Sequence, residues 1–245
     1  MSTRFAGRRI LVTGASGGIG SAVVDGFRRE GGWVCALGHS NPGNGDLNLA
    51  ADLSSDAAVA DAITAVNEAG GGVDIVVHSG AASVNAGIID TPSEDWLRIY
   101  DVNVVGAVRL IRECAPAMAA RGGGNFVMIS SINARFATPT LAAYATSKAA
   151  LDGLIRTAAL DLAPQNIRVN GVAPASVDTP LLARNFDRTP DPAAARAANV
   201  GRHPLGRLGT PQDVAETVLF VASDAAEWMT GTIVNLDGGA GVTRR

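Results

Sequence analysis

Short apolar runs alternate with longer amphipathic stretches along almost the whole chain. The runs that predict strands are residues 9–13, 33–37, 47–52, 73–77, 125–130, 167–172 and 232–236. The stretches that predict helices are residues 18–30, 56–69, 93–120, 142–162 and 211–222. Regular alternation of strand and helix is typical of a parallel sheet covered by helices. The sequence therefore predicts an α/β fold with one doubly wound parallel sheet of about seven strands.

Two segments interrupt this alternation. Residues 39–48 contain a cluster of Asn, Pro and Gly that is too short for a crossover helix, so we expect a plain loop there. Residues 174–204 hold five of the 11 prolines and four arginines, which predicts a long excursion over the mouth of an active site. We find no linker or repeat, and we expect one domain over residues 1–245 with a substrate-covering excursion at about 174–205.

The composition excludes several classes of protein. With 47% apolar and 18% charged residues the chain is too apolar to be disordered. A formal net charge of -3 gives no basic field for a nucleic acid. No stretch approaches the roughly 18 apolar residues of a membrane span, and the N-terminus has no apolar signal core. We therefore expect a cytoplasmic protein without nucleic-acid or membrane partners.

The residues that could bind metal are few and scattered. Cys35 and Cys114 have no pairing or metal-ligand spacing, so we interpret them as buried thiols. The three histidines are also far apart in the sequence, and we predict no metal site. The 20 cationic residues include only one lysine, Lys148, which follows Tyr144 by four positions.

The first predicted strand runs into a glycine-rich turn at residues 13–20, with Gly14, Gly18 and Gly20 at a GxxxGxG spacing. Glycines let backbone N–H groups approach a pyrophosphate, and the following helix N-terminus favours its negative charge. A tight bend without a ligand is the alternative, but the strand–turn–helix context favours a phosphate cradle that also includes Ser16 and Ile19.

Tyr144 and Lys148 stand at the start of a predicted helix, one turn apart on the same face. A tyrosine normally titrates near pH 10, and a neighbouring ammonium favours the phenolate, so we expect Lys148 to lower the pKa of Tyr144 into a range useful for acid/base catalysis. The alternative is an incidental surface pair. With one lysine and two tyrosines in the chain, chance placement at this offset has odds on the order of one in a hundred.

These motifs resemble those of the short-chain dehydrogenase/reductase family, and the resemblance covers nearly all of the chain. The turn matches the family's TGxxxGIG, residues 144–148 match its YxxxK, and Ser131 lies thirteen residues before the tyrosine. The resemblance implies a Rossmann-type fold and a catalytic tetrad of Asn103, Ser131, Tyr144 and Lys148, in which Asn103 supports a water-mediated proton relay. It also implies a homotetramer that packs through residues 93–120 and 142–162.

The resemblance further implies a nicotinamide dinucleotide cofactor. Asp52 and Leu53 match the family's adenine contact, and Val177 and Thr179 its nicotinamide contact. The family's NNAG appears here as residues 78–81 (HSGA), so His78 is either a core histidine or a ribose or adenine contact. The full set of expected cofactor-binding residues is Gly14, Ser16, Gly18, Ile19, Gly20, His39, Asp52, Leu53, His78, Gly80, Tyr144, Lys148, Val177 and Thr179.

The end of the second strand bears on the choice between NAD and NADP. NAD-dependent dinucleotide folds usually place a carboxylate there to bind the ribose 2′-hydroxyl, and this chain has Gly38. His39 and Ser40 follow and could donate hydrogen bonds to a 2′-phosphate. We therefore predict a preference for NADP(H), with NAD(H) as the alternative.

The predicted reaction is reversible hydride transfer between the cofactor and a small-molecule ketone or secondary alcohol, with Tyr144 as acid/base. Three alternatives stay open. A 3-oxoacyl-(acyl carrier protein) reductase is similar overall, but Gln165 stands where carrier-dependent relatives tend to have arginine, while Arg121 lies near their other docking position. A cofactor-free lyase and a non-catalytic dinucleotide-binding protein are disfavoured by the intact glycine turn and tetrad. We expect the substrate walls from residues 82–87, 133–140 and 174–204.

Overall fold

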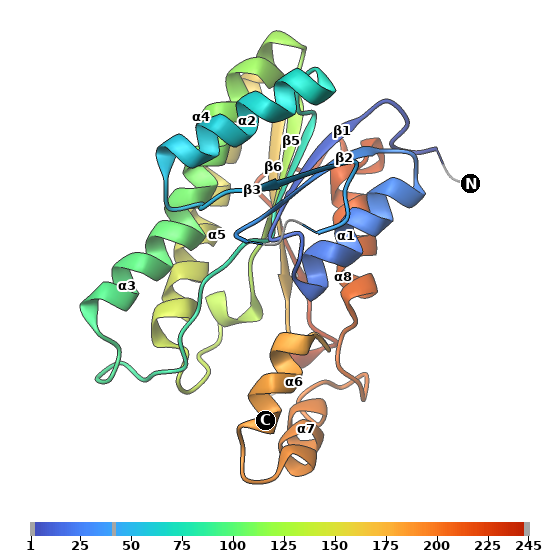
Figure 1. Ribbon diagram of the computed structural model, residues 1–245. Coiled ribbons are helices and arrows are strands. Elements are labelled where there is room, and N and C mark those ends of the chain that lie inside the picture. Colours follow the sequence, from blue (N-terminus) through green and yellow to red (C-terminus); the bar gives the residue numbers. More distant parts are fainter. Residues whose placement is uncertain (1–2, 41–42, 243–245) are drawn as a thin grey trace.

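Seven parallel strands form one sheet in the described part of the computed structural model, residues 3–40 and 43–242 (Figure 1). Their order across the sheet is β3-β2-β1-β4-β5-β6-β7. The bounds are β1 Arg9–Thr13, β2 Trp33–Gly38, β3 Leu47–Ala50, β4 Ile75–His78, β5 Gly124–Ile129, β6 Ile167–Pro174 and β7 Ile233–Leu236. This is the predicted doubly wound Rossmann-type sheet, with strand ends shifted by one to a few residues.

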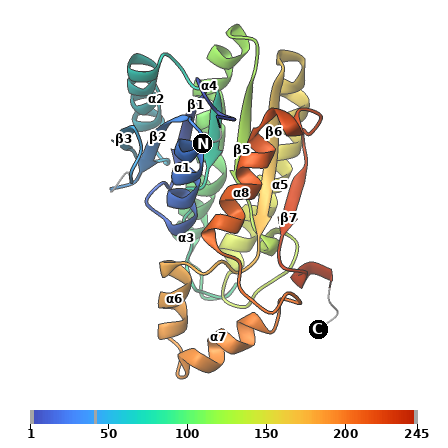
Figure 2. The same ribbon diagram turned by 90° about the vertical axis from the view of Figure 1, so that its right-hand side faces the viewer.

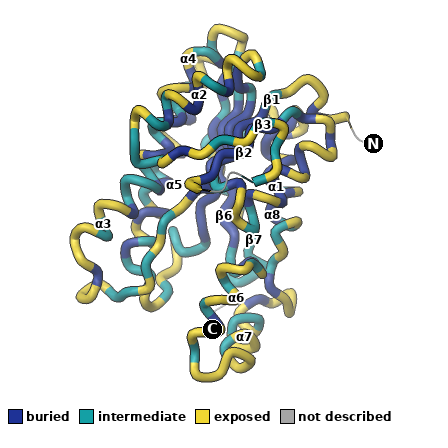
Figure 3. Tube along the Cα trace, viewed as in Figure 1, coloured by how far each residue is buried: buried dark blue, intermediate teal, exposed yellow. Residues whose placement is uncertain are grey.

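Helices cover both faces of the sheet (Figure 2). Their bounds are α1 Gly18–Arg29, α2 Asp56–Gly70, α3 Ser93–Tyr100, α4 Gly106–Ala120, α5 Ala142–Leu162, α6 Pro180–Asp187, α7 Pro192–Val200 and α8 Pro211–Ala222. The core cluster on one face contains residues of α1 and α8, and the cluster on the other face contains residues of α2, α4 and α5. The middle of the sheet is consequently buried from both sides (Figure 3).

Alternation along β1 explains why its apolar run is continuous. Ile10 and Val12 belong to the core cluster with α1 and α8, whereas Leu11 belongs to the opposite cluster. Successive side chains of a strand point to opposite faces, so a strand that is covered on both sides needs apolar residues at every position. The three consecutive apolar residues Ile10, Leu11 and Val12 therefore indicate a central strand rather than an edge strand.

The chain order reverses between β1 and β4. From β1 the strands run outward to β2 and β3 on one side, and β4 begins the other half of the sheet. In open α/β sheets such a reversal leaves a crevice at the carboxyl ends of the strands, where ligands bind. The fold therefore places the turn after β1 and the segment after β4 next to each other at this crevice.

The single helix expected over residues 93–120 is wrong. The structure has α3, then a π-helical turn at Asp101–Val105, then α4. The turn includes Asn103, whose buried side chain bonds the backbone of Ala82. A helical period persists across the segment, so the sequence pattern did not reveal the extra residue in the turn.

The excursion after β6 contains two helices that the sequence analysis did not predict, α6 and α7. Each begins with a capping side chain followed by proline: Thr179 accepts a hydrogen bond from the backbone of Leu182, and Asp191 accepts one from Ala194. The start of α8 has the same arrangement, with Thr210 as the cap and Pro211 as the first helical residue. In the loop expected at residues 39–48, positions 41–42 lie outside the described residues, and β3 already begins at position 47.

Candidate active site

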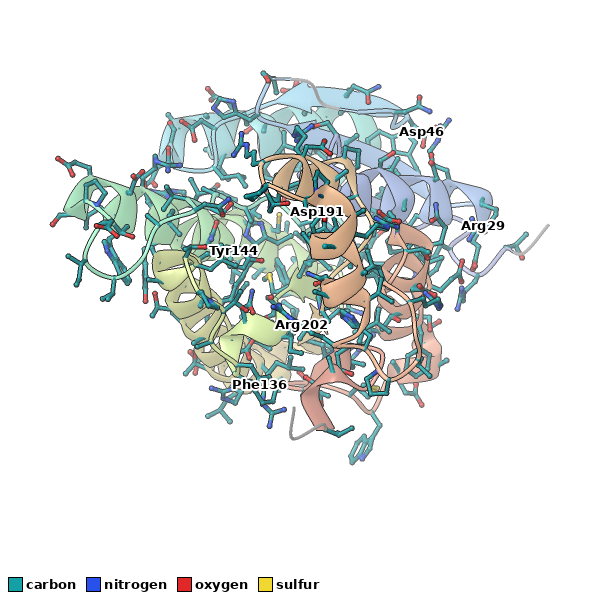
Figure 4. All side chains as sticks on the ribbon, turned by 90° about the horizontal axis from the view of Figure 1, so that it is seen from below. Arg29, Asp46, Phe136, Tyr144, Asp191 and Arg202 are labelled. Atoms are coloured by element: carbon teal, nitrogen blue, oxygen red, sulfur yellow. The ribbon has the colours of Figure 1, made fainter. Side chains whose placement is uncertain are left out.

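A cavity of about 720 Å³ opens at the carboxyl ends of the strands. Figure 4 views the molecule from the end that α6 and α7 occupy, with Tyr144 of α5 labelled on that side. All predicted site residues line this cavity except two, Asn103 and His78. The predicted residues that line it are Gly14, Ser16, Gly18, Ile19, Gly20, His39, Asp52, Leu53, Gly80, Ser131, Tyr144, Lys148, Val177 and Thr179.

The turn between β1 and α1 accepts only glycine at positions 14 and 20. Gly14 has φ +64°, and a Cβ there would lie 2.7 Å from the backbone nitrogen of Gly80. A Cβ on Gly20 would overlap the carbonyl oxygen of Gly14. The first turn of α1 carries no acidic side chain, and no side chain caps its N-terminus. Free backbone N–H groups at a helix N-terminus suit a pyrophosphate, so these residues fit a dinucleotide.

Lys148 is held deep in the wall of this cavity, with 2% of its surface exposed. Its Nζ donates a hydrogen bond of 2.8 Å to the carbonyl oxygen of Ile129 at the end of β5. The same Nζ lies 5.6 Å from the ring centroid of Tyr144. Burial lowers the pKa of Lys148 to about 8, against an opposing effect of the Asp152 carboxylate. The pair is therefore part of the site and not an incidental surface pair.

The pKa of Tyr144 departs from the sequence-based prediction. Burial raises the pKa of its phenol, and hydrogen bonding with Ser131 opposes that rise. The predicted lowering by Lys148 is therefore not seen in this structure, where the lysine Nζ bonds the carbonyl oxygen of Ile129 and lies 5.6 Å from the centroid of the Tyr144 ring. The phenol is therefore protonated at neutral pH in this state of the protein.

Ser131 lies at the carboxyl end of β5, beside the phenol. Its Oγ accepts a hydrogen bond of 3.1 Å from the backbone N–H of Asn133. That bond occupies a lone pair and leaves the hydroxyl proton available as a donor. Ser131 is 7% exposed and lines the cavity, so it can hydrogen-bond an oxygen that enters beside Tyr144.

Asn103 lies behind the cavity wall rather than in it. Its Oδ1 accepts from the backbone N–H of Ala82 at 2.7 Å, and its Nδ2 donates to the carbonyl of Ala82 at 3.0 Å and to Ser147 Oγ at 2.9 Å. The side chain therefore ties the segment after β4 to α5. The side-chain amide of Asn103 is fully buried and already bonded to these partners. Any catalytic role of Asn103 would therefore come from its backbone and from the π-helical turn around it.

His78, the last residue of β4, is also buried behind the wall. Its Nδ1 lies 3.0 Å from Thr13 Oγ1, which accepts a hydrogen bond from the backbone N–H of Gly80. Burial, together with the nearby Lys148 charge, lowers the pKa of His78 to about 3, so the ring is neutral. The structure places His78 as a core histidine that supports Gly80 and the glycine turn.

The far end of the cavity is more exposed. His39 follows β2 and Asp52 follows β3, and both side chains are open to solvent. Asp52 Oδ1 accepts from the Ser54 hydroxyl at 2.7 Å and from its backbone N–H at 2.9 Å, and these bonds lower the pKa of the carboxyl group. Leu53 packs against Gly80, and a Cβ added to Gly80 would lie 2.7 Å from Leu53 Cδ1.

Several residues at the substrate end of the cavity come from the segments expected as walls. Asn85, Asn133 and Asn185 line the cavity with Leu181 and Leu182. Arg98 of α3 was not expected and carried no motif. Of the loop arginines, none of Arg184, Arg188, Arg196 and Arg202 lines the cavity. Only the fold could bring these positions together, because they are far apart in sequence.

Comparison with known proteins identifies the family. The family model described as enoyl-(acyl carrier protein) reductase matches residues 14–241. The 3-oxoacyl-(acyl carrier protein) reductase of Thermotoga maritima is 32% identical, over 96% of this chain and 98% of that protein. This chain belongs to the short-chain dehydrogenase/reductase family. It is an NAD(P)-dependent oxidoreductase that interconverts ketones and secondary alcohols.

Two further relatives of this short-chain dehydrogenase/reductase are named for other activities. The cis-4-hydroxycyclohexanecarboxylate dehydrogenase of Sinomonas cyclohexanicum is 34% identical over 98% of both chains. The ligand-free aldohexose dehydrogenase of Thermoplasma acidophilum has a TM-score of 0.92 and 32% identity, over 99% of this chain and 96% of that one. The similarity therefore extends to enzymes with different substrates.

Within residues 3–40 and 43–242, no helix has the length and apolarity to cross a membrane. Within the same residues, no group of three or more His, Cys, Asp or Glu side chains is arranged to hold a metal ion.

Proposed function

We propose that Tyr144 is the acid/base group of this enzyme, assisted by Ser131, Lys148 and Asn103. The observation that carries the proposal is that Tyr144, Ser131 and Lys148 line the same cavity as the glycine turn after β1. A bound nicotinamide dinucleotide supplies or accepts the hydride. The residues of this chain then have to hold the substrate oxygen and move its proton.

In the reductive direction each group has a defined task. Ser131 donates a hydrogen bond to the substrate oxygen, and the protonated phenol of Tyr144 transfers its proton to that oxygen as negative charge develops. Lys148 places positive charge near the phenol and stabilises the phenolate that remains. The high pKa of Tyr144 before substrate binds keeps the proton available. Asn103 would support return of the proton through its backbone and the π-helical turn.

The test is Tyr144→Phe, which removes the hydroxyl and keeps the ring. We expect turnover to fall by at least about a hundredfold, the usual scale of a lost acid/base group, while dinucleotide binding measured by fluorescence titration stays within a few-fold. Tyr100→Phe is the matched control, because Tyr100 is the only other tyrosine and does not line the cavity. Near-normal turnover of Tyr144→Phe would refute the assignment.

The cofactor preference we propose is NADP(H), with NAD(H) accepted less well. Support comes from the end of β2, where Gly38 offers no carboxylate to a 2′-hydroxyl and His39 is exposed at the cavity. The Asp52 carboxylate is engaged by Ser54. Turnover compared at saturating NADPH and NADH tests the preference, and faster turnover with NADH at equal substrate would overturn it.

The substrate we propose is a small or medium-sized free ketone or secondary alcohol. The second candidate is a carrier-bound 3-oxoacyl group, which the Thermotoga maritima relative favours. Against it, the Arg121 guanidinium bonds the carbonyl of Val73 and lies 3.7 Å from Asp74, so it is engaged within its own subunit. A screen at 340 nm with free ketones, alcohols and a carrier-bound 3-oxoacyl substrate separates the two. Activity confined to the carrier-bound substrate would reverse the choice.

We also propose that the protein is a cytoplasmic homotetramer. Leu97 of α3, Val105 of the π-helical turn and Leu160 of α5 are large apolar residues that are 73%, 41% and 77% exposed. They lie on the helices through which family members are expected to pair, and burying them in an interface would remove apolar surface from water. Light scattering after size-exclusion chromatography tests the assembly, and a monomer at micromolar concentration would refute it.

A further inference from the structure

A buried hydrogen bond outside the proposed tetrad joins the end of β5 to α5. Ser130 Oγ donates to Asp152 Oδ1 at 2.5 Å, and the two residues are 2% and 7% exposed. The Ser130 backbone N–H is also fixed, because it donates to the carbonyl of Val172 on β6 at 2.7 Å. Neither side chain is used by the mechanism above, and a carboxylate at this depth calls for an explanation.

Ser130 stands between two groups that the site depends on. The residue before it, Ile129, provides the carbonyl that accepts the hydrogen bond of Lys148 Nζ. The residue after it, Ser131, provides the hydroxyl beside Tyr144. A side-chain bond at position 130 therefore fixes both neighbours against α5, the helix that carries the tyrosine and the lysine.

Asp152 also follows Lys148 by one helical turn on α5, close enough for its charge to act on the buried ammonium. The carboxylate raises the pKa of Lys148 against the larger lowering by burial. The other titratable groups around Lys148 are the phenol of Tyr144 and the neutral ring of His78. Burial raises the pKa of Asp152 itself, and the hydrogen bond from Ser130 and the charges of Arg156, Lys148 and Arg135 oppose that rise.

We propose that Asp152 is a positioning residue that acts in two ways: through Ser130 it fixes the end of β5 against α5, and its carboxylate holds the positive charge on Lys148. The catalytic consequence of these two effects rests on the proposed function. The electrostatic effect itself concerns only the folded chain and can be measured without substrate.

Two variants separate the effects. Asp152→Asn removes the negative charge and keeps an oxygen that can accept from Ser130. Ser130→Ala removes the hydrogen bond and keeps the carboxylate. Because Lys148 is the only lysine in the chain, ¹³Cε-lysine labelling of untagged protein gives a single side-chain NMR resonance, and its titration reports the charge on Lys148 directly. Turnover as a function of pH is measured on the same samples.

In Asp152→Asn we expect the titration midpoint of Lys148 to fall by at least about half a pH unit, since an opposing charge is lost. The alkaline limb of turnover should move to lower pH by the same amount. In Ser130→Ala we expect a smaller midpoint change and a loss of turnover at every pH, about tenfold, because a misplaced Ser131 and Ile129 carbonyl misalign the site. Asp152→Glu keeps the charge and is the matched control, and Asp152→Ser, which also removes the charge, replaces Asp152→Asn in every comparison if that variant does not fold.

Two results would overturn the electrostatic half of the proposal. One is an unchanged titration midpoint of Lys148 in folded Asp152→Asn. The other is a midpoint in folded Asp152→Glu that is lowered as much as in Asp152→Asn. Wild-type turnover in Ser130→Ala would overturn the positioning half. A different result marks failure of the proposed function: wild-type protein without NAD(P)-dependent activity on any carbonyl or alcohol, while the single lysine resonance still responds to Asp152→Asn.

Discussion

Gly18→Ala tests how tightly the glycine turn packs against the excursion after β6. A Cβ at Gly18 would lie 2.8 Å from Thr179 Cγ2 and 3.1 Å from Thr179 Cβ. Thr179 has to move, and it caps α6 by accepting the Leu182 N–H at 3.3 Å. Overpacking lowers the free energy of unfolding by about 1–3 kcal/mol. The higher helix propensity of alanine offsets less than about 1 kcal/mol of this loss at the start of a helix. We expect a net loss of about 1–2 kcal/mol in the free energy of unfolding.

A double-mutant cycle isolates the contact. Thr179→Ser removes the Cγ2 methyl and keeps the capping hydroxyl, so it should relieve the clash that Gly18→Ala creates. We expect a coupling free energy of at least about 1 kcal/mol between the two positions. The measurement is urea denaturation followed by circular dichroism, at fixed protein concentration and without dinucleotide, so that neither assembly nor ligand binding changes between variants.

Gly153→Ala is the matched control. Gly153 also lies in a helix, α5, but a Cβ there would meet no atom within 4 Å. This substitution should stabilise the protein slightly or leave it unchanged, because alanine is the better helix former. If Gly18→Ala costs the same with threonine or serine at position 179, the packing argument is wrong and the cost lies in the turn itself.

Three further predictions concern other parts of the chain. Burial raises the pKa of both Cys35 and Cys114 to about 12, so an aromatic disulfide reagent should label neither thiol in the native protein and both after denaturation. The Arg207 guanidinium holds the pKa of Asp213 well below its usual range. The Asp213 carboxylate therefore contributes to the free energy of unfolding above about pH 4, and this contribution is lost as the pH falls further. Asp213→Asn should flatten this acid dependence in urea titrations. Thr210 caps α8 in a capping box, and Thr210→Ala should lower the free energy of unfolding by about 1 kcal/mol in the same assay.

The sheet could be predicted from the sequence because its strands are covered on both faces. In β1, the consecutive apolar residues Ile10, Leu11 and Val12 are all buried, which indicates a strand covered on both faces. The helices of the excursion were missed because proline density suggested irregular structure, although Thr179 and Asp191 each precede a proline as Thr210 does. A capping residue followed by proline is a local signal, and its presence at positions 179 and 191 predicts α6 and α7 as it does α8 at position 210.

The candidate site was predictable where its residues share a local motif and not where they meet only in the fold. Gly14, Gly18 and Gly20 lie within one turn, and Tyr144 and Lys148 within one helical turn, so spacing alone related them. The pKa of Tyr144 could not be inferred in this way. Its direction depends on how far the phenol is buried and on its hydrogen bond with Ser131, and both are set by tertiary packing.

The π-helical turn at Asp101–Val105 fixes the rotation of α3 relative to α4. A chain that lost one residue in this turn could continue as a regular α-helix, and everything before the deletion would rotate by about 100° about the helix axis. The amide of Asn103 would then turn away from Ala82, and Arg98 would leave the cavity edge. This short segment therefore tolerates substitutions at its exposed positions far better than any change in its length.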